Sequence, residues 1–260
     1  MTGPLALHGG GEFLPGDEPF LRALLAAARP AAAERARGCL PAPADGGDPA
    51  AIRIVVVPVA AARERPDLAL ATAEEAFDRI AAGSGQTSRF DGVPIVDRES
   101  AGAARWAGLL AGADLVYLPG GDPDLAPAIL PGTVALRAIL AARARGAVLA
   151  GASAGAMALA AWTWTPAGGR TGLGIVPGLV VAPHFEPEGF AGWHERVAAA
   201  PGKLGLLGLS EQTGILSSGR PSDGHGQPWR VIGPGSASWY PPGAGEPIVT
   251  RDGGTLLLPD

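Results

Sequence analysis

A serine between two pairs of small residues is the first feature of this sequence that could do chemistry. Ser153 is the centre of Gly-Ala-Ser-Ala-Gly at residues 151–155, after an apolar run at 147–150 and before a helix-favouring run at 156–160. This order predicts a nucleophile elbow, a sharp strand-to-helix turn that exposes the serine hydroxyl. Small neighbours let the backbone pass close to itself there. The chain has 40 glycines, so an ordinary tight turn explains the motif about as well.

A nucleophilic serine needs a general base, and the chain supplies four histidines. His184 ends the apolar run 179–183 and is the best candidate to take the proton of Ser153. His8 also ends an apolar run, but simple packing is the plainer explanation there. His194 lies in a helical pattern, and His225 lies in a turn-like segment. We therefore predict a pair of Ser153 and His184.

Two adjacent glycines follow another apolar run. Gly120 and Gly121 come directly after residues 115–118 and Pro119. Their backbone N–H groups, with the N–H of Ala154 after the serine, are of the kind that binds a developing oxyanion. Loops after the strands of a parallel sheet meet at its carboxyl edge, which would bring this pair toward the serine. An ordinary Gly-Gly turn is the alternative interpretation.

The elements that must hold these residues alternate along the chain. Strand-like apolar runs occupy residues 5–8, 52–59, 94–96, 115–118 and 147–150, and helical patterns occupy 66–82, 100–111 and 133–145. This alternation predicts a three-layer α/β sandwich with a mostly parallel sheet, in a single domain over residues 1–260. Residues 201–260 are rich in short strand patterns, which predict an antiparallel C-terminal extension at one sheet edge. Residues 31–49 are predicted to form a surface loop.

Composition excludes several classes of protein. The net charge of −5 and the lack of a basic cluster predict no nucleic-acid partner. Cys39 is the single cysteine, so no internal disulfide is expected, and we interpret it as a bystander. The start of the chain lacks a signal-peptide pattern, which favours a cytoplasmic location. Residues 146–169 carry no charge, but they are mostly Ala and Gly, so no membrane span is predicted.

Metal and cofactor motifs are absent from the sequence. There is no His-Glu-x-x-His, no cysteine pair and no Asp-rich loop. The glycine-rich run at residues 8–12 matches neither the dinucleotide-binding nor the P-loop spacing. We therefore expect chemistry without a metal or a cofactor.

Together, the ordered motifs resemble the aspartyl dipeptidases and cyanophycinases. The matching segments are residues 9–11, 119–122, 151–156, 183–185 and 208–213. The resemblance runs from about residue 5 to about residue 216, and it implies a flavodoxin-like fold of the glutamine-amidotransferase-like group. It also implies a nucleophile at Ser153, a base at His184 and an oxyanion hole near Gly121 and Ala154.

The third member of a catalytic triad is the point where the sequence departs from this resemblance. The resemblance implies an Asp or Glu between serine and histidine, but residues 154–183 contain no acid. Class I glutamine amidotransferases use the spacing His-x-Glu, which Glu186 fills here. We predict Glu186 as the acid that orients the imidazole, since residues two apart on an extended segment face one side. A solvated loop glutamate is equally consistent, and Glu188 and Glu211 are the fallbacks.

The resemblance implies a serine hydrolase that cuts a peptide or isopeptide bond in a small substrate, either a dipeptide or a cyanophycin-like peptide. Gly120, Asp122 and Glu211 are the predicted substrate-binding residues. Asp122 stands where relatives more often carry an amide, and it is suited to bind an ammonium group. An acidic substrate side chain would need a cation, for which Arg170 and Arg196 are the candidates.

Two other functions stay open at this point. The first is a non-catalytic ligand-binding relative that has lost the triad acid. The second is a domain acting on amides like the glutamine amidotransferases, although those use cysteine where this chain has Ser153. The resemblance also leaves a homodimer open.

Overall fold

A mixed eight-stranded sheet forms the centre of the computed structural model, which describes residues 2–38, 47–219 and 226–259. The strands, in their order across the sheet, are β14 (Thr255–Leu258), β11 (Gln227–Ile232), β10 (Gly214–Ser217), β1 (Leu5–His8), β5 (Val148–Ala152), β4 (Leu115–Leu118), β2 (Ile52–Val56) and β3 (Ser88–Gly92). The five strands from β1 to β3 are parallel. The strands β10, β11 and β14 are antiparallel, which confirms the predicted extension for these three.

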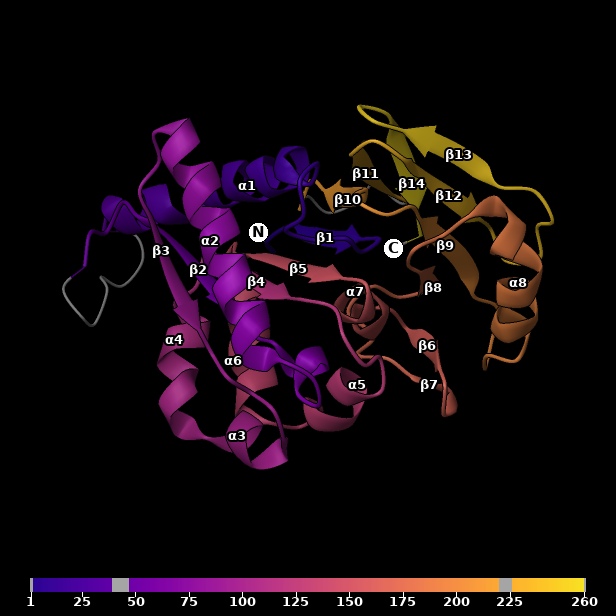
Figure 1. The fold of residues 1–260 in the computed structure, drawn as a ribbon, viewed down its shortest axis with the longest axis horizontal. Helices are drawn as coiled ribbons and strands as arrows, with labels where there is room; N and C mark the ends of the chain where they lie inside the picture. Colours follow the sequence, from indigo (N-terminus) through magenta and orange to yellow (C-terminus); the bar gives the residue numbers. More distant parts are fainter. Residues whose placement is uncertain (1, 39–46, 220–225, 260) are drawn as a thin grey trace.

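Helices cover both faces of this sheet. Figure 1 shows α1 (Glu18–Ala36) and α2 (Pro66–Ser84) on one face, and α4 (Ala107–Ala111) and α6 (Val134–Ala144) on the other. The shorter helices are α3 (Arg98–Gly102), α5 (Leu125–Ile129), α7 (Ala154–Leu159) and α8 (Phe190–Ala198), with 3₁₀ turns η1 (Val59–Ala61), η2 (Ala104–Trp106) and η3 (Pro187–Gly189). The predicted three-layer α/β sandwich is confirmed.

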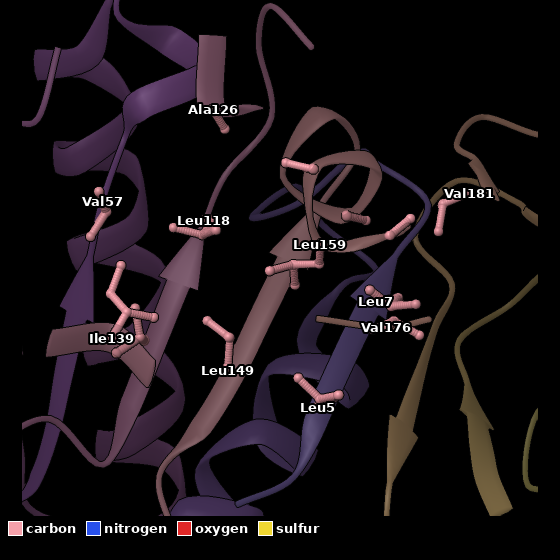
Figure 2. Close-up of a cluster of buried hydrophobic side chains, with 14 of the residues drawn as sticks. Leu5, Leu7, Val57, Leu118, Ala126, Ile139, Leu149, Leu159, Val176 and Val181 are labelled. Carbon is pink, nitrogen blue, oxygen red and sulfur yellow. The ribbon is translucent and has the colours of Figure 1, made fainter. Parts of the chain in front are cut away.

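Alternating side chains of the central strands form two separate cores. Leu5 and Leu7 of β1 and Leu149 of β5 point to the face covered by α6 and α7 and belong to the same buried cluster as Ile139 and Leu159 (Figure 2). Ala6, Tyr117 and Ala150 point to the opposite face, against α1 and α2. Complete burial of one large aliphatic side chain contributes roughly 1.5–3 kcal/mol. The central strands are therefore rigid platforms for the loops at their carboxyl ends.

A second sheet lies beside the first and was not predicted. It contains β13 (Ile248–Arg251), β12 (Ser236–Tyr240), β9 (Gly205–Leu209) and β8 (Leu179–Ala182), in that order. Figure 1 shows α8 on the outside of this sheet. The prediction that residues 204–209 and 236–239 extend the main sheet is wrong. The segment from β8 through α8 to β9 is a crossover unit, so β8 and β9 pair in parallel and end at the same edge.

Several local predictions need correction. Residues 31–36 of the predicted surface loop continue helix α1, because Ala31, Ala32 and Arg35 are buried against the rest of the fold. The predicted strand at 94–96 is instead β3, which ends at Gly92 before the ladder-breaking Pro94. The predicted helix at 100–111 is divided into α3, η2 and α4. Residues 39–46 of the predicted loop, Cys39 and His225 lie outside the described residues.

The uncharged stretch at residues 146–169 is divided among several elements. It contains β5, α7 and the first strand of a short hairpin, β6 (Trp162–Thr165), whose second strand is β7 (Gly168–Thr171). Within the described ranges, no helix combines the length and the apolar character that crossing a membrane requires.

Candidate active site

Ser153 lies on a strained turn at the end of β5. Its backbone has φ +46° and ψ −115°, which is unusual for a residue with a side chain, and its N–H donates to the carbonyl of His8 at 2.9 Å. The flanking glycines are needed for close packing. A Cβ at Gly155 would lie 2.0 Å from the carbonyl oxygen of Leu118, and one at Gly151 would lie 2.6 Å from the backbone of Gly155. The local geometry is therefore that of a nucleophile elbow.

His184 faces the hydroxyl of Ser153. The Oγ of Ser153 lies 3.1 Å from Nε2 of His184, which follows β8 by two residues and has φ +49°. The N–H of His184 donates to the carbonyl of Gly9 at 2.7 Å. A Cβ on Gly10 would lie 2.2 Å from Cε1 of the imidazole. The glycine-rich loop after β1 therefore packs against the imidazole of His184 and accepts a hydrogen bond from its backbone.

Glu211 is the carboxylate that contacts His184 at the ring nitrogen that faces away from Ser153. Its Oε1 lies 2.7 Å from Nδ1 of His184. His184 lies two positions after the end of β8, and Glu211 lies two positions after the end of β9. These two strands are parallel neighbours, so both residues leave the sheet at the same edge. Gln212 has φ +52° and donates its N–H to the carbonyl of Gly10 at 2.7 Å, which fixes the turn that carries Glu211.

The prediction that Glu186 partners His184 is wrong in this structure, because Nδ1 is bonded to Glu211. That prediction assumed an extended chain through the histidine. The positive φ of His184 turns the chain instead, Phe185 is buried against Tyr240, and Glu186 is exposed. The fallback residue Glu188 is exposed as well.

The loop after β4 lies beside Ser153, as predicted. A Cβ built on Gly120 would lie 3.1 Å from Cβ and 3.6 Å from Oγ of the serine. The N–H of Gly120 is occupied, since it donates to Oε1 of Glu12 at 2.7 Å. Gly121 has φ +137° and packs against the backbone of Ala60. Within the described part of the chain, no residue accepts from the N–H of Gly121 or of Ala154.

The charged residues near this loop are paired with one another. The N–H of Asp122 donates to the carbonyl of Ala60 at 2.8 Å, and its Oδ2 lies 3.1 Å from Nη1 of Arg63. The guanidinium of Arg170 contacts the carboxylate of Asp124 at 2.9 Å and donates a hydrogen bond to the backbone carbonyl of Asp124. The other candidate cation, Arg196, lies over the ring of Trp193. Both arginines proposed for an acidic substrate therefore have intramolecular contacts.

The Ser153–His184–Glu211 chain of contacts is open to solvent. The side chains of His184 and Glu211 are 48% and 65% exposed. A contact this exposed contributes little to folding stability. Beneath the loop after β1, burial raises the pKa of Tyr117, and the charges of Glu12 and Asp17 raise it further. Among the described residues, no three His, Cys, Asp or Glu side chains form a group that could hold a metal ion.

Comparison with known proteins decides the family. The model of Peptidase family S51 matches residues 46–222, which contain Ser153, His184 and Glu211. The chain belongs to peptidase family S51. The predicted resemblance to aspartyl dipeptidases and cyanophycinases is thereby confirmed.

One solved structure agrees with membership of family S51. The chain is similar to a peptidase from an acI-B1 Actinobacterium, at 26% identity and a TM-score of 0.72, over 99% of this chain and 98% of that one. A putative Peptidase E protein from Listeria monocytogenes EGD-e has 14% identity to this chain and a TM-score of 0.48, over 96% of this chain and 99% of that one. No curated protein matches. The family and the first neighbour support a serine peptidase function.

Sequence reasoning ranked Glu211 below Glu186 and gave no role to Glu12. A signal for Glu211 was present, because residues 179–183, 190–200 and 204–209 form a strand, helix and strand pattern. Such a unit makes its two strands parallel, and residues that follow both strands then lie together. No comparable signal exists for Glu12, which reaches Gly120 from a loop 108 positions earlier.

Proposed function

We propose that this member of family S51 is a serine peptidase that cuts a peptide or isopeptide bond in a small substrate, through an acyl-enzyme with Ser153. The observation that carries this proposal is the unbroken series of contacts from Ser153 Oγ to His184 Nε2 and from His184 Nδ1 to Glu211, at 3.1 and 2.7 Å. A serine, a base and an orienting acid in this order are what nucleophilic acyl transfer needs.

Acylation begins with attack of Ser153 Oγ on the substrate carbonyl. The hydroxyl proton passes to Nε2 of His184 as the new O–C bond forms. Glu211 accepts a hydrogen bond from Nδ1, which selects the tautomer with a free Nε2 and stabilises the imidazolium. The imidazolium then gives its proton to the leaving amine, and the C–N bond breaks.

The charge on the carbonyl oxygen needs donors near the serine. The N–H of Ala154 follows the nucleophile, and the N–H of Gly121 belongs to the loop that packs beside it. These two groups are the proposed oxyanion hole. A water molecule then attacks the acyl-enzyme with His184 as base, which releases the acid product and restores the hydroxyl of Ser153.

The substrate class is proposed from the charges near the loop after β4. Asp122 is 23% exposed at its side chain, and its partner Arg63 is 71% exposed. A surface pair of this kind is weak, so a substrate ammonium group can compete for Asp122. A dipeptide or a cyanophycin-like isopeptide carries such a group beside the scissile bond. Gly120, Asp122 and Glu211 border the proposed position of this substrate.

The non-catalytic alternative rested on the missing acid between residues 154 and 183. The 2.7 Å contact of Glu211 with His184 speaks against that reason, because the orienting acid follows the histidine instead. The amide-transferring alternative still lacks the cysteine nucleophile, since Ser153 occupies that position.

Labelling with a fluorophosphonate tests the proposal directly. The folded protein should be labelled at one serine, and the label should disappear in Ser153→Ala, whose fold can be checked by circular dichroism. Absence of labelling in the folded unsubstituted chain would contradict a serine peptidase.

A library of dipeptides and β-linked isopeptides then tests the substrate class. Cleavage is expected for members with a free ammonium group near the scissile bond. Asp122→Asn should raise KM for those members by about tenfold, as expected for one lost charged contact of about 1.4 kcal/mol. Equal cleavage of N-acetylated members would contradict the role of Asp122.

A further inference from the structure

The side chain of Glu12 joins the loop after β1 to the loop after β4, on either side of the strand that carries Ser153. It belongs to the loop after β1, and it accepts the N–H of Gly120 in the loop after β4 at 2.7 Å. Strand β5 runs between β1 and β4, so this contact passes over the turn that carries Ser153. The position of a Cβ on Gly120 lies 2.9 Å from Oε1 of Glu12 and 3.6 Å from Oγ of Ser153. The carboxylate therefore borders the place where a substrate carbonyl would react.

The loop after β4 needs such a contact because two adjacent glycines, Gly120 and Gly121, occupy the part of it nearest Ser153. A Cβ at Gly120 would lie 2.9 Å from Oε1 of Glu12 and 3.1 Å from Cβ of Ser153, and Gly121 has a backbone conformation of φ +137°. Glycine loses more conformational freedom on ordering than any other residue. Two adjacent glycines would therefore let the N–H groups of the loop turn away from the serine unless other contacts hold them.

Contacts from two sides hold this loop. On one side, Gly121 packs on the backbone of Ala60, and the carbonyl of Ala60 accepts the N–H of Asp122. On the other side, Glu12 holds the N–H of Gly120. The peptide unit between Gly120 and Gly121, which carries the proposed oxyanion donor, lies between these two anchors.

Glu12 is itself held firmly. The loop that carries it rests on two side chains that are 0% exposed, His8 and Asp17, whose Nε2 and Oδ1 lie 3.0 Å apart without hydrogen-bonding geometry. Nδ1 of His8 accepts the N–H of Gly10, and Oδ2 of Asp17 accepts the N–H of Phe13. Phe13 follows Glu12 directly and packs between the rings of Phe77 and Tyr117. The carboxylate is thus placed by groups on both sides of it in the chain.

We propose that Glu12 is a positioning residue, whose hydrogen bond to Gly120 keeps the N–H of Gly121 aimed at the reacting carbonyl. This inference rests on the proposed function. The role belongs to the oxygen acceptor and not to the negative charge, since a negative charge near the carbonyl opposes the developing oxyanion.

Three variants separate the acceptor from the charge. Glu12→Gln keeps an oxygen acceptor and removes the charge, whereas Glu12→Ala removes both. Glu188→Ala is the matched control, because it removes an exposed carboxylate four positions after His184 in the chain. Unfolding temperatures are measured first, so that only folded variants are compared.

The readouts are the rate of fluorophosphonate labelling and the separate kcat and KM for a cleaved peptide. We expect Glu12→Ala to lower the labelling rate and kcat by about 10- to 100-fold with KM within about twofold, as for a displaced reacting group. Glu12→Gln and Glu188→Ala should stay within about threefold of the unsubstituted chain.

Each other outcome overturns this inference. Equal rates for Glu12→Ala and the unsubstituted chain would show that the hydrogen bond of Glu12 to Gly120 does not position the N–H of Gly121. Equal loss in Glu12→Gln and Glu12→Ala would show that the charge acts, and a rise in KM confined to cationic substrates would make Glu12 a recognition residue. A failure of the proposed function is distinct, because the unsubstituted chain would then not be labelled at Ser153 at all.

Discussion

The two ends of the central sheet are built in opposite ways. At the amino end, the guanidinium of Arg35 binds both oxygens of Asp114 at 2.6 and 2.7 Å and also the carbonyls of Pro49 and Ala51. Asp114 further accepts the N–H of Arg53. Both charged side chains are buried, and their hydrogen-bonding groups have partners.

The carboxyl end is strained and open instead. In the part of the chain that the structure describes, the non-glycine residues with positive φ are Phe13 and Ser153, which follow strands β1 and β5 of the central sheet, and His184 and Gln212, which follow β8 and β9 of the adjoining second sheet. Strained backbone persists only where the surroundings hold it, and such strain gathers at functional sites. The difference teaches that the amino end satisfies its buried charges within the fold, while the carboxyl end holds strained backbone and exposed polar side chains.

The largest expected effect comes from the histidine at the open end. His184→Ala should lower kcat for peptide cleavage by about 10⁵- to 10⁶-fold, because Ser153 would lose its base. The free energy of unfolding should change by less than about 1 kcal/mol, since this side chain is half exposed. Steady-state kinetics and urea unfolding check the two halves. A large loss of stability with little loss of kcat would show that His184 supports the fold and not the reaction.

The next effect distinguishes the two candidate acids. Glu211→Gln should lower kcat by about 10³- to 10⁴-fold, because the amide cannot stabilise the imidazolium as a carboxylate does. Glu186→Gln is the matched control and should leave kcat within about twofold. Both variants should unfold at the same urea concentration as the unsubstituted chain. A greater loss in Glu186→Gln would restore the original prediction for the acid.

A change at the amino end should do the reverse. Arg35→Met leaves the buried Asp114 unpaired and should lower the free energy of unfolding by about 3–5 kcal/mol. Urea unfolding measures this loss, and kcat of the folded protein should be unchanged at low temperature. Adding Asp114→Leu to the same chain should recover most of the stability, because no buried charge then remains. A loss of kcat in the folded Arg35→Met protein would mean that the two ends are coupled.

The smallest effect comes from two glycines with the same backbone angle. Gly10 and Gly146 both have φ +109°, so alanine at either should lower the free energy of unfolding by about 1–3 kcal/mol. A Cβ at Gly146 meets nothing within 4 Å, whereas one at Gly10 meets the imidazole of His184. Only Gly10→Ala should therefore lower kcat, by about tenfold or more for a displaced base. Equal kcat in the two variants would show that the loop after β1 does not position the histidine.

Several local features were readable from the residues alone. The Gly-Ala-Ser-Ala-Gly turn is a local signal, because Gly151 is required by a contact with Gly155 four positions later, although Gly155 is required by a contact with the distant Leu118. The parallel strands were readable because burial on both faces leaves continuous apolar runs. His184 was readable because it directly follows such a run. Local sterics and burial patterns determine features of this kind.

Pairings between distant strands decided the rest. Whether residues 204–209 extend the main sheet or run beside β8 depends on the direction of the chain after α8, and only the parallel arrangement puts Glu211 on His184. The same holds for Glu12 and Gly120, which meet because β1 and β4 flank β5. The sequence by itself determined Ser153 and His184 as the candidate nucleophile and base, since each follows a continuous apolar run that predicts a buried strand. The tertiary structure decided which carboxylates serve them, because a long side chain reaches whichever loop the sheet order brings near.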